Sequence, residues 1–471
     1  MVFPIIGLSL LVSLVSALLI IVLNVRFSRL IAVAGSAAIL AMLLALLAVD
    51  LPTGTLAVAE SYPFVTAFNI GLDLNLNAIT FTLSLMATIV ALAAALAGNP
   101  EKAREKAANM LIMFFEFAAL GIFASANFFI FFIFWDIGVV VLFFMINSLG
   151  SANRRYASMK FIIYEIFASS MLLLGIILIY FYTPVNSFNI QYIQAHAASI
   201  PLGTQEIIFV VMFIAFAVNM PLFPLHFWLP DAHTEASTQG SMLLSGVLTK
   251  FGAYGLLLLF TTLPIAGKFA IPVAILAGFS AVYAALVTML QHDIKRVIAY
   301  TTIVDMGIIL VAIAALNPFG EYGAVYGMLA HGITIALMFL VVGCMHHIFG
   351  ERDMRIVKGV VAKATSTAYS FLLGTFGITG VPLTAGFIAD VLIFIGAMQA
   401  FGVYGALPLI GLLIIGAFLY FVINKSFMLT NESSETIEYL GVSHKVGYAL
   451  LLFFMFLFGI LPSLLLGLVK L

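Results

Sequence analysis

Long apolar runs recur along the whole chain, and short polar segments separate them. A helix that crosses the hydrocarbon core of a membrane needs about 20 mostly apolar residues. The pattern therefore predicts an all-α polytopic membrane protein with about 14 transmembrane helices. The predicted spans are residues 4–24, 30–49, 75–98, 107–124, 127–148, 159–181, 206–229, 240–262, 268–290, 297–316, 321–346, 365–399, 403–424 and 445–468.

Two of these spans contain residues that interrupt helices. The seventh meets Pro221 and Pro224, and the twelfth contains Gly380 and Pro382. Proline removes a backbone donor and clashes with the preceding turn, so each span is predicted to be broken at these residues. Backbone groups freed in a bilayer survive only against protein or water, so both breaks are expected inside the bundle.

Composition supports the membrane prediction and narrows the chemistry. Of 471 residues, 64% are hydrophobic and 8% are charged, whereas soluble domains carry about 25% charged residues. The first apolar run lacks a preceding basic residue and a small-residue cleavage site, which predicts a retained span and not a signal peptide. The single cysteine, Cys344, excludes an internal disulfide and a multi-thiolate metal or iron–sulfur site. We therefore expect no cofactor, metal or redox centre on this chain, and nothing indicates nucleic-acid binding.

The net charge of -1 conceals a strong positional bias of the 19 Lys and Arg residues. Sixteen of them lie in or beside loops that follow odd-numbered spans: Arg26, Arg29, Lys102, Arg104, Lys106, Arg154, Arg155, Lys160, Lys295, Arg296, Arg352, Arg355, Lys358, Lys363, Lys425 and Lys445. Lys268 and Lys470 fall on the other side, and Lys250 lies in the middle of the eighth span. Because cytoplasmic loops are enriched in Lys and Arg, the odd loops are predicted to be cytoplasmic and both termini to lie outside.

Lys250 and Asp136 occupy depths where ionisable side chains are rare. Lys250 lies ten residues past Gly240 and Asp136 nine past Asn127, which places both about 13–15 Å deep in a core about 30 Å thick. A lysine there costs at least about 2.5–3.5 kcal/mol on insertion scales. A structural ion pair with a carboxylate would explain Lys250, and a neutral carboxyl group bonded to a backbone carbonyl would explain Asp136, but we favour a proton relay for both.

The same arithmetic places further ionisable residues near the midplane, namely Glu116, Asp305, His331 and Asp390. Ionisable groups at one depth on many helices form a row parallel to the membrane, which predicts lateral charge coupling. A simple pore would instead stack such groups along the membrane normal. Glu165 lies only five residues past Lys160, and the sequence leaves open whether it is an interfacial acid or a relay residue.

Histidines add candidates to this row. His331 alone would more often be a satisfied core histidine, but its place in the row favours proton transfer. His226 and His233 flank the turn LPDAH after the seventh span. They are candidates for a proton uptake path at the cytoplasmic mouth, although loop histidines are more often simply solvated.

Five segments resemble a known family of transport proteins: FFIFWDIG, PLHFWLPDAHTEASTQGSMLLSGVLTKFGAYGLL, QHDIKRVIAYTTIVDMG, MLAHGITIALMFLVVG and GVPLTAGFIAD. Over nearly the whole chain they resemble the antiporter-like subunits of respiratory complex I, closest to the M type. Subunits of Mrp-type cation/proton antiporters and of membrane-bound hydrogenases share the middle block. The resemblance alone does not choose among these complexes.

The resemblance implies a fold with two inverted five-helix repeats, each holding one broken helix. For this chain it implies N-terminal helices in 1–105, a first repeat in 106–262, a second repeat in 268–424 and a C-terminal helix in 445–471. Transporters in general build their binding sites at mid-depth from inverted repeats and interrupted helices. The predicted breaks in the seventh and twelfth spans agree with that expectation.

The proton-relay positions of the family carry over one at a time. Lys250 matches the lysine of the eighth span, and His331 matches the histidine of an AHG motif. Asp136 and Asp390 stand where the fifth and twelfth spans of M-type subunits usually have glutamate. The resemblance therefore implies that these four residues keep the relay chemistry, with shorter carboxylate side chains at two of them.

Two positions depart from the family. Asn219 replaces a lysine of the seventh span, and Asp305 replaces a histidine of the tenth. In the family that lysine forms an ion pair with the acid of the fifth span, and asparagine does not titrate. We therefore expect either lost pumping or a changed mechanism, in which Lys250 takes Asp305 as a new partner while Asp136 still gates proton access.

The favoured interpretation is a proton-translocating subunit of a complex I-like, redox-driven ion pump. Sodium ions are the alternative cargo, since a row rich in carboxylates offers the oxygen ligands that hard cations prefer. The expected partners are the lipid bilayer and other membrane subunits of a complex I-like or hydrogenase-like assembly, in the inner (plasma) membrane of a prokaryotic cell. A subunit of an Mrp-type antiporter or hydrogenase, and a structural subunit without pumping, remain alternatives.

Overall fold

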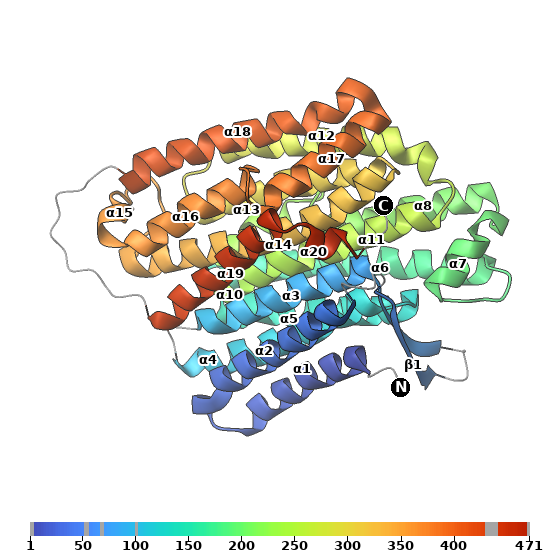
Figure 1. Ribbon diagram of the computed structural model, residues 1–471, viewed down its shortest axis with the longest axis horizontal. Coiled ribbons are helices and arrows are strands. Elements are labelled where there is room, and N and C mark those ends of the chain that lie inside the picture. The colour runs from blue at the N-terminus through green and yellow to red at the C-terminus, as the bar shows by residue number, and fades with distance from the viewer. Residues whose placement is uncertain (1–3, 51–55, 66–69, 99–101, 429–440, 469–471) are drawn as a thin grey trace.

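The computed structural model describes residues 4–50, 56–65, 70–98, 102–428 and 441–468, so Lys470 lies outside the described part. The long helices are α1 (Ile5–Val22), α2 (Val25–Asp50), α3 (Ala78–Ala97), α4 (Lys102–Ala124), α5 (Phe128–Leu149), α6 (Arg154–Tyr182), α8 (Leu202–Asn219), α11 (Thr249–Thr262), α12 (Ala266–Thr288), α13 (Ile294–Ala314), α14 (Pro318–Phe349), α16 (Thr365–Ile378), α17 (Ala385–Phe401), α18 (Leu407–Val422) and α19 (Val442–Ile460). The short ones are α7 (Ile190–His196), η2 (Ala197–Ser199), α9 (Trp228–Glu235), α10 (Thr238–Leu243), η3 (Leu244–Leu248), α15 (Val360–Lys363), η4 (Gly402–Ala406), η5 (Ile423–Met428) and α20 (Ser463–Leu466). Figure 1 shows the long helices alongside one another, with α1 and α2 along one edge and α12 and α18 along the other.

The helical segments confirm an integral membrane protein. Thirteen of them, among the described residues, are long and apolar enough to cross a membrane. One of the thirteen, Ala385–Met428, includes Gly402, whose φ of 59° separates α17 from α18. The count of fourteen spans and the inverted repeats stay predictions.

Polar side chains begin many of these helices. The Asn77 side chain accepts hydrogen bonds from the backbone of α3, and Asn127 does the same for α5. Asp293 caps α13, and Asn317 caps α14, which also has Pro318 in its first turn. Because the first N–H groups of a helix have no partner within it, these caps fix where the apolar runs become helical.

A two-stranded antiparallel hairpin interrupts the all-helical pattern between α2 and α3. Strand β1 (Val58–Val65) pairs with β2 (Ile70–Leu76). Glu60 of β1 accepts hydrogen bonds from the backbone N–H groups of Ile6 and Gly7, both at 2.8 Å. A carboxylate is favourable at a helix N-terminus, where these N–H groups lack helical partners. The apolar pattern did not predict this hairpin, which caps the N-terminus of α1 through Glu60.

Both predicted breaks are present. Helix α8 ends at Asn219, and α9 begins only at Trp228, with a cis peptide bond before Pro224. Helix α16 ends at Ile378 and α17 begins at Ala385, and in between Gly380 has a φ of 62°. The breaks between α8 and α9 and between α16 and α17 thus lie at the prolines and glycines from which they were predicted.

Ion pairs connect the helices at the end predicted to be cytoplasmic. Asp231 of α9 accepts from Lys160 of α6 at 2.7 Å and from Arg296 of α13. Nearby, Arg352 contacts Asp293 at 3.4 Å. Asp231 therefore joins helices that lie on opposite sides of the boundary predicted between the two repeats.

Candidate functional site

Lys250 lies where the helix containing α10 and α11 loses its regular pitch. It is the second residue of α11, directly after the π-helical segment η3. Its side chain is fully buried. The Lys250 Nζ donates to the carbonyl oxygen of Ser245 at 2.6 Å and to Thr249 Oγ1 at 3.4 Å. Single π-helical turns frequently mark functional positions in helices, and this one brings a backbone carbonyl to the buried amine.

His331 connects Lys250 to Asp305. The Lys250 Nζ and His331 Nδ1 are 2.6 Å apart, and His331 Nε2 is 3.5 Å from Asp305 Oδ2. A protonated lysine has only donors, so His331 Nδ1 then accepts and Nε2 carries the hydrogen that faces Asp305. The expected partnership of Lys250 with Asp305 is thus mediated by an imidazole, and the contacts join α11, α14 and α13.

Asp390 faces the same site across a small cavity of about 30 Å³. The cavity is also lined by Asp305 and His331, and one water needs at least about 10–15 Å³ together with polar partners. Gly380 makes room for this acid, because a Cβ there would lie 2.2 Å from Asp390 Oδ2. We refer to Lys250, Asp305 and His331 with their helices as the α11–α13–α14 region. The break between α16 and α17 therefore places Asp390 of α17 beside this region.

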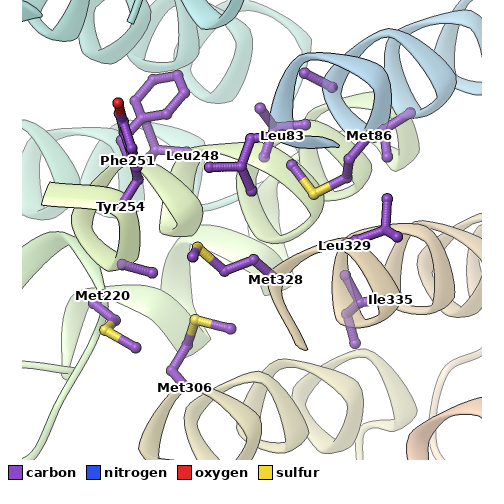
Figure 2. Packing of buried hydrophobic residues seen from close by; sticks show 14 of the residues in the cluster. Leu83, Met86, Met220, Leu248, Phe251, Tyr254, Met306, Met328, Leu329 and Ile335 are labelled. Atoms are coloured by element: carbon purple, nitrogen blue, oxygen red, sulfur yellow. The ribbon is translucent and has the colours of Figure 1, made fainter. Parts of the chain in front are cut away.

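Closely packed apolar side chains surround these groups. Figure 2 shows Leu248, Phe251, Met306 and Met328 among the buried residues of this core, and each lies within three residues of Lys250, Asp305 or His331 in the sequence. Interiors of this kind leave few voids larger than a water molecule. The ionisable groups of the site are therefore connected by direct contacts and by the small cavity.

Asp136 and Glu116 lie apart from this chain of contacts. Asp136 of α5 accepts from Ser169 Oγ of α6 at 2.5 Å, and Glu116 of α4 accepts from Ser36 Oγ of α2 at 2.6 Å. Among the described residues, no hydrogen bond joins either acid to Lys250. The aromatic residues next to these groups in the sequence are in contact instead. The Phe251 ring centroid is 5.8 Å from that of Phe115 and 6.4 Å from that of Trp135.

Glu165 is the site residue that the sequence left undecided. Its side chain is fully buried on α6, and Asn219 Nδ2 donates to both carboxylate oxygens at 3.3 and 3.2 Å. Asn219 Oδ1 in turn accepts from the backbone N–H of Gly252 on α11 at 2.9 Å. Asn219, the position that departs from the family, thus faces an acid. The missing lysine at this position was the signal in the sequence that could have led to Glu165. We refer to Asp136, Glu165 and Asn219 with their helices as the α5–α6–α8 region.

The two uptake-path histidines are not solvated loop residues. His226 and His233 are both fully buried, and their ring nitrogens have no hydrogen-bond partner among the described residues. The His233 ring stacks on Phe339 with centroids 4.4 Å apart, and it lies within electrostatic range of Lys295 and Lys250. Helix α9, which follows the break, packs against α6 and α13, and both rings lie inside the protein and not at an open mouth.

Comparisons with known proteins agree with this arrangement. Residues 125–416 match the transmembrane family described as NADH:quinone oxidoreductase/Mrp antiporter. The chain is 32% identical over 409 residues to NADH-quinone oxidoreductase subunit M of Rickettsia felis, covering 86% of this chain and 82% of that protein. It is also 32% identical over 357 residues to NAD(P)H-quinone oxidoreductase chain 4 1 of a Synechococcus strain, covering 74% and 67%.

Solved structures share the fold. A chain of respiratory complex I from Thermus thermophilus gives a TM-score of 0.89 at 23% identity, covering 98% of this chain and 97% of that one. A chain of the Mrp complex from Dietzia gives 0.85 at 18% identity, covering 99% and 96%. A chain of the archaeal membrane-bound sulfane sulfur reductase gives 0.87 at 26% identity, covering 100% and 78%. These relatives are parts of multisubunit membrane complexes, and with the family match over residues 125–416 they show that the chain belongs to the NADH:quinone oxidoreductase/Mrp antiporter family, in the fold of the complex I antiporter-like subunits.

Proposed function

We propose that this chain moves protons across the membrane as an antiporter-like subunit of a complex I-like assembly. The assembly would lie in the inner (plasma) membrane of a prokaryotic cell, with redox centres on partner chains and both termini of this chain outside. The observation that carries the proposal is the run of buried contacts from Lys250 through His331 to Asp305, at 2.6 and 3.5 Å. Family membership and the names of the quinone oxidoreductase relatives support the assembly.

Each member of this run exchanges protons. Protonated Lys250 gives its proton to His331 Nδ1, while His331 Nε2 gives its own proton to the Asp305 carboxylate. One N–H bond forms and one breaks on the imidazole, so the ring carries a proton across without changing its charge. Asp305 then passes the proton to Asp390 through the cavity that both acids line.

Proton transfer fits these groups better than sodium transfer. Hard cations such as Na⁺ prefer sites made of oxygen ligands, whereas an amine and an imidazole occupy the centre of this site. A protonated lysine also repels a second cation. We infer that protons enter from the side of Lys295, pass His233, and reach Lys250, in keeping with the electrostatic range of His233 to both lysines.

The decisive experiment uses the whole purified complex in sealed vesicles, with proton movement and electron transfer measured together. We expect Lys250→Ala to remove the proton flux that depends on this subunit, because the first member of the run is lost. Lys268→Ala is the matched control, since Lys268 is an exposed lysine paired with Glu206. Flux should be the same in sodium-free medium.

Two outcomes would contradict the proposal. If the Lys250→Ala complex assembles and moves as many protons per electron as the unaltered complex, the chain has a structural role. If the ion flux through the complex requires sodium ions, the proposal that this chain moves protons is wrong.

A further inference from the structure

Glu165 is a fully buried ionisable group that the Lys250 run does not use. Among the described residues it has no ion pair, and its hydrogen-bond donor is the neutral amide of Asn219. The nearest lysine along the chain, Lys160, is bound to Asp231 instead. Burying an unpaired carboxylate in a protein interior is unfavourable, so this environment favours the neutral acid and makes the anion a transient state.

Asn219 holds this acid in a fixed place. Its Oδ1 accepts from Gly252 N at 2.9 Å, which orients the Nδ2 toward Glu165. Gly252 allows the contact, because a Cβ there would lie 2.6 Å from the carbonyl oxygen of Phe216 and 2.7 Å from the Met220 nitrogen. The end of α8 therefore packs directly on the backbone of α11, two residues past Lys250.

The amide suits both protonation states of the acid. Asn219 Nδ2 lies at almost equal distances from the two carboxylate oxygens, 3.3 and 3.2 Å. It can donate to an anion or to the carbonyl oxygen of a protonated carboxyl group. A lysine at position 219 would instead fix Glu165 as the anion of an ion pair. Asparagine leaves the acid itself free to gain and lose the proton.

We propose that Glu165 is the proton-carrying residue of the α5–α6–α8 region, with Asn219 as its positioning residue. In this role the acid alternates between neutral and negative, where a lysine at position 219 would alternate between positive and neutral. The Asp136 carboxyl group, which lies within electrostatic range of Glu165, gives its proton to Glu165, so the O–H bond on Asp136 breaks as the O–H bond on Glu165 forms. The reverse transfer returns the proton and leaves Glu165 as the anion. A proton on Glu165 weakens the attraction for a charge on Lys250 across the Asn219–Gly252 contact, and so couples the two regions. This inference rests on the proposed function.

The test compares variants in the assembled complex, with Lys250→Ala defining the flux that does not need this subunit. Glu165→Gln keeps the size and the acceptor for Asn219 but removes the titrating proton. Positioned proton-transfer groups contribute about 10²–10⁴-fold to rates, so we expect the subunit-dependent flux to fall at least about tenfold. Glu206→Gln is the matched control, because Glu206 is a partly exposed glutamate in a surface ion pair.

Two further readouts separate a proton carrier from a structural acid. Infrared difference spectra should show a carboxyl band that responds to turnover and is missing in Glu165→Gln. Adding Asn219→Lys to Glu165→Gln should restore part of the flux, because lysine supplies a titrating group at the same place. A purely structural role predicts neither the lost band nor the rescue.

The outcomes are distinguishable. If Lys250→Ala loses flux but Glu165→Gln keeps both flux and the carboxyl band, this inference is wrong and the proposed function stands. If neither variant loses flux in assembled complexes, both are wrong. If Glu165→Gln prevents assembly, Glu165→Asp and the infrared band of the unaltered complex decide: an unresponsive band overturns the inference.

Discussion

The α11–α13–α14 region and the α5–α6–α8 region hold their ionisable groups in different ways. In the first, Lys250 contacts His331 and His331 contacts Asp305, so titrating groups touch one another. In the second, neutral donors separate the acids, with Ser169 on Asp136 and Asn219 on Glu165. On the proposed function, the run of titrating contacts passes a proton along, whereas the acid held by a neutral donor stores one.

Breaking the run at its middle should have the largest effect. His331→Gln removes the ring that carries a proton between Lys250 and Asp305, and glutamine does not exchange protons. We expect the subunit-dependent flux to fall about 10²-fold, measured in vesicles at constant electron transfer. His196→Gln, at an exposed histidine of α7, should have no effect. Equal flux in both variants would show that the proton bypasses the imidazole.

The packing that joins the two regions should respond next. Gly252→Ala forces a methyl group against the end of α8, where the nearest atoms would be 2.6 and 2.7 Å away. Overpacking of this kind costs about 1–3 kcal/mol, so we expect a lower midpoint of thermal unfolding in detergent. Gly203→Ala is the control, since a Cβ there meets nothing within 4 Å. An unchanged midpoint for Gly252→Ala would mean that the regions are not tightly packed together.

Asp136 offers a smaller and more selective change. Asp136→Asn keeps an oxygen for the Ser169 hydroxyl, so thermal stability should stay nearly constant. The titrating group is lost, however, and we expect flux to fall about tenfold, which corresponds to about 1.4 kcal/mol. Assembly on native gels and flux in vesicles check the two parts separately. Full flux with normal assembly would show that Asp136 is bonded to Ser169 for structure alone.

The smallest effect is expected in the loop after α14. Hydrogen bonds from the Arg355 side chain and backbone hold the pKa of the partly exposed Asp353 at about 2. Because this pKa is depressed on folding, the interaction is complete above the ordinary carboxyl range and is lost only as pH falls toward 2. Asp353→Asn should therefore leave the pH profile of flux between pH 5 and 8 unchanged. A shifted profile would connect this loop to the relay.

Depth along the helices predicted much of the site. Lys250, Asp305 and His331 were placed at one depth from their distance to the span ends, and they meet because neighbouring helices cross the membrane side by side. Depth left the role of Glu165 open, because its depth was counted from Lys160. That lysine is partly exposed and paired with Asp231, whereas Glu165, five residues further along α6, is fully buried.

Other features needed three dimensions. The burial of His226 and His233 depends on how the segment after the break packs against α6 and α13, which the proline positions alone do not specify. The hairpin of β1 and β2 lacks a strict alternation of buried and exposed residues, because several neighbouring residues of β1 are exposed. Its function as a cap for α1 depends on a single contact partner, Glu60, far along the chain.

The two ion pairs of Asp231 bear on how much the scaffold moves during a transport cycle. Many transporters expose their sites alternately by rocking one bundle of helices against the other. Here the Asp231 carboxylate binds Lys160 of α6 and Arg296 of α13 at once. Rocking of α6 against α13 would therefore break at least one of these ion pairs in every cycle. Proton transfer between neighbouring side chains requires no such movement of the helices, so it is compatible with a scaffold that these ion pairs hold rigid.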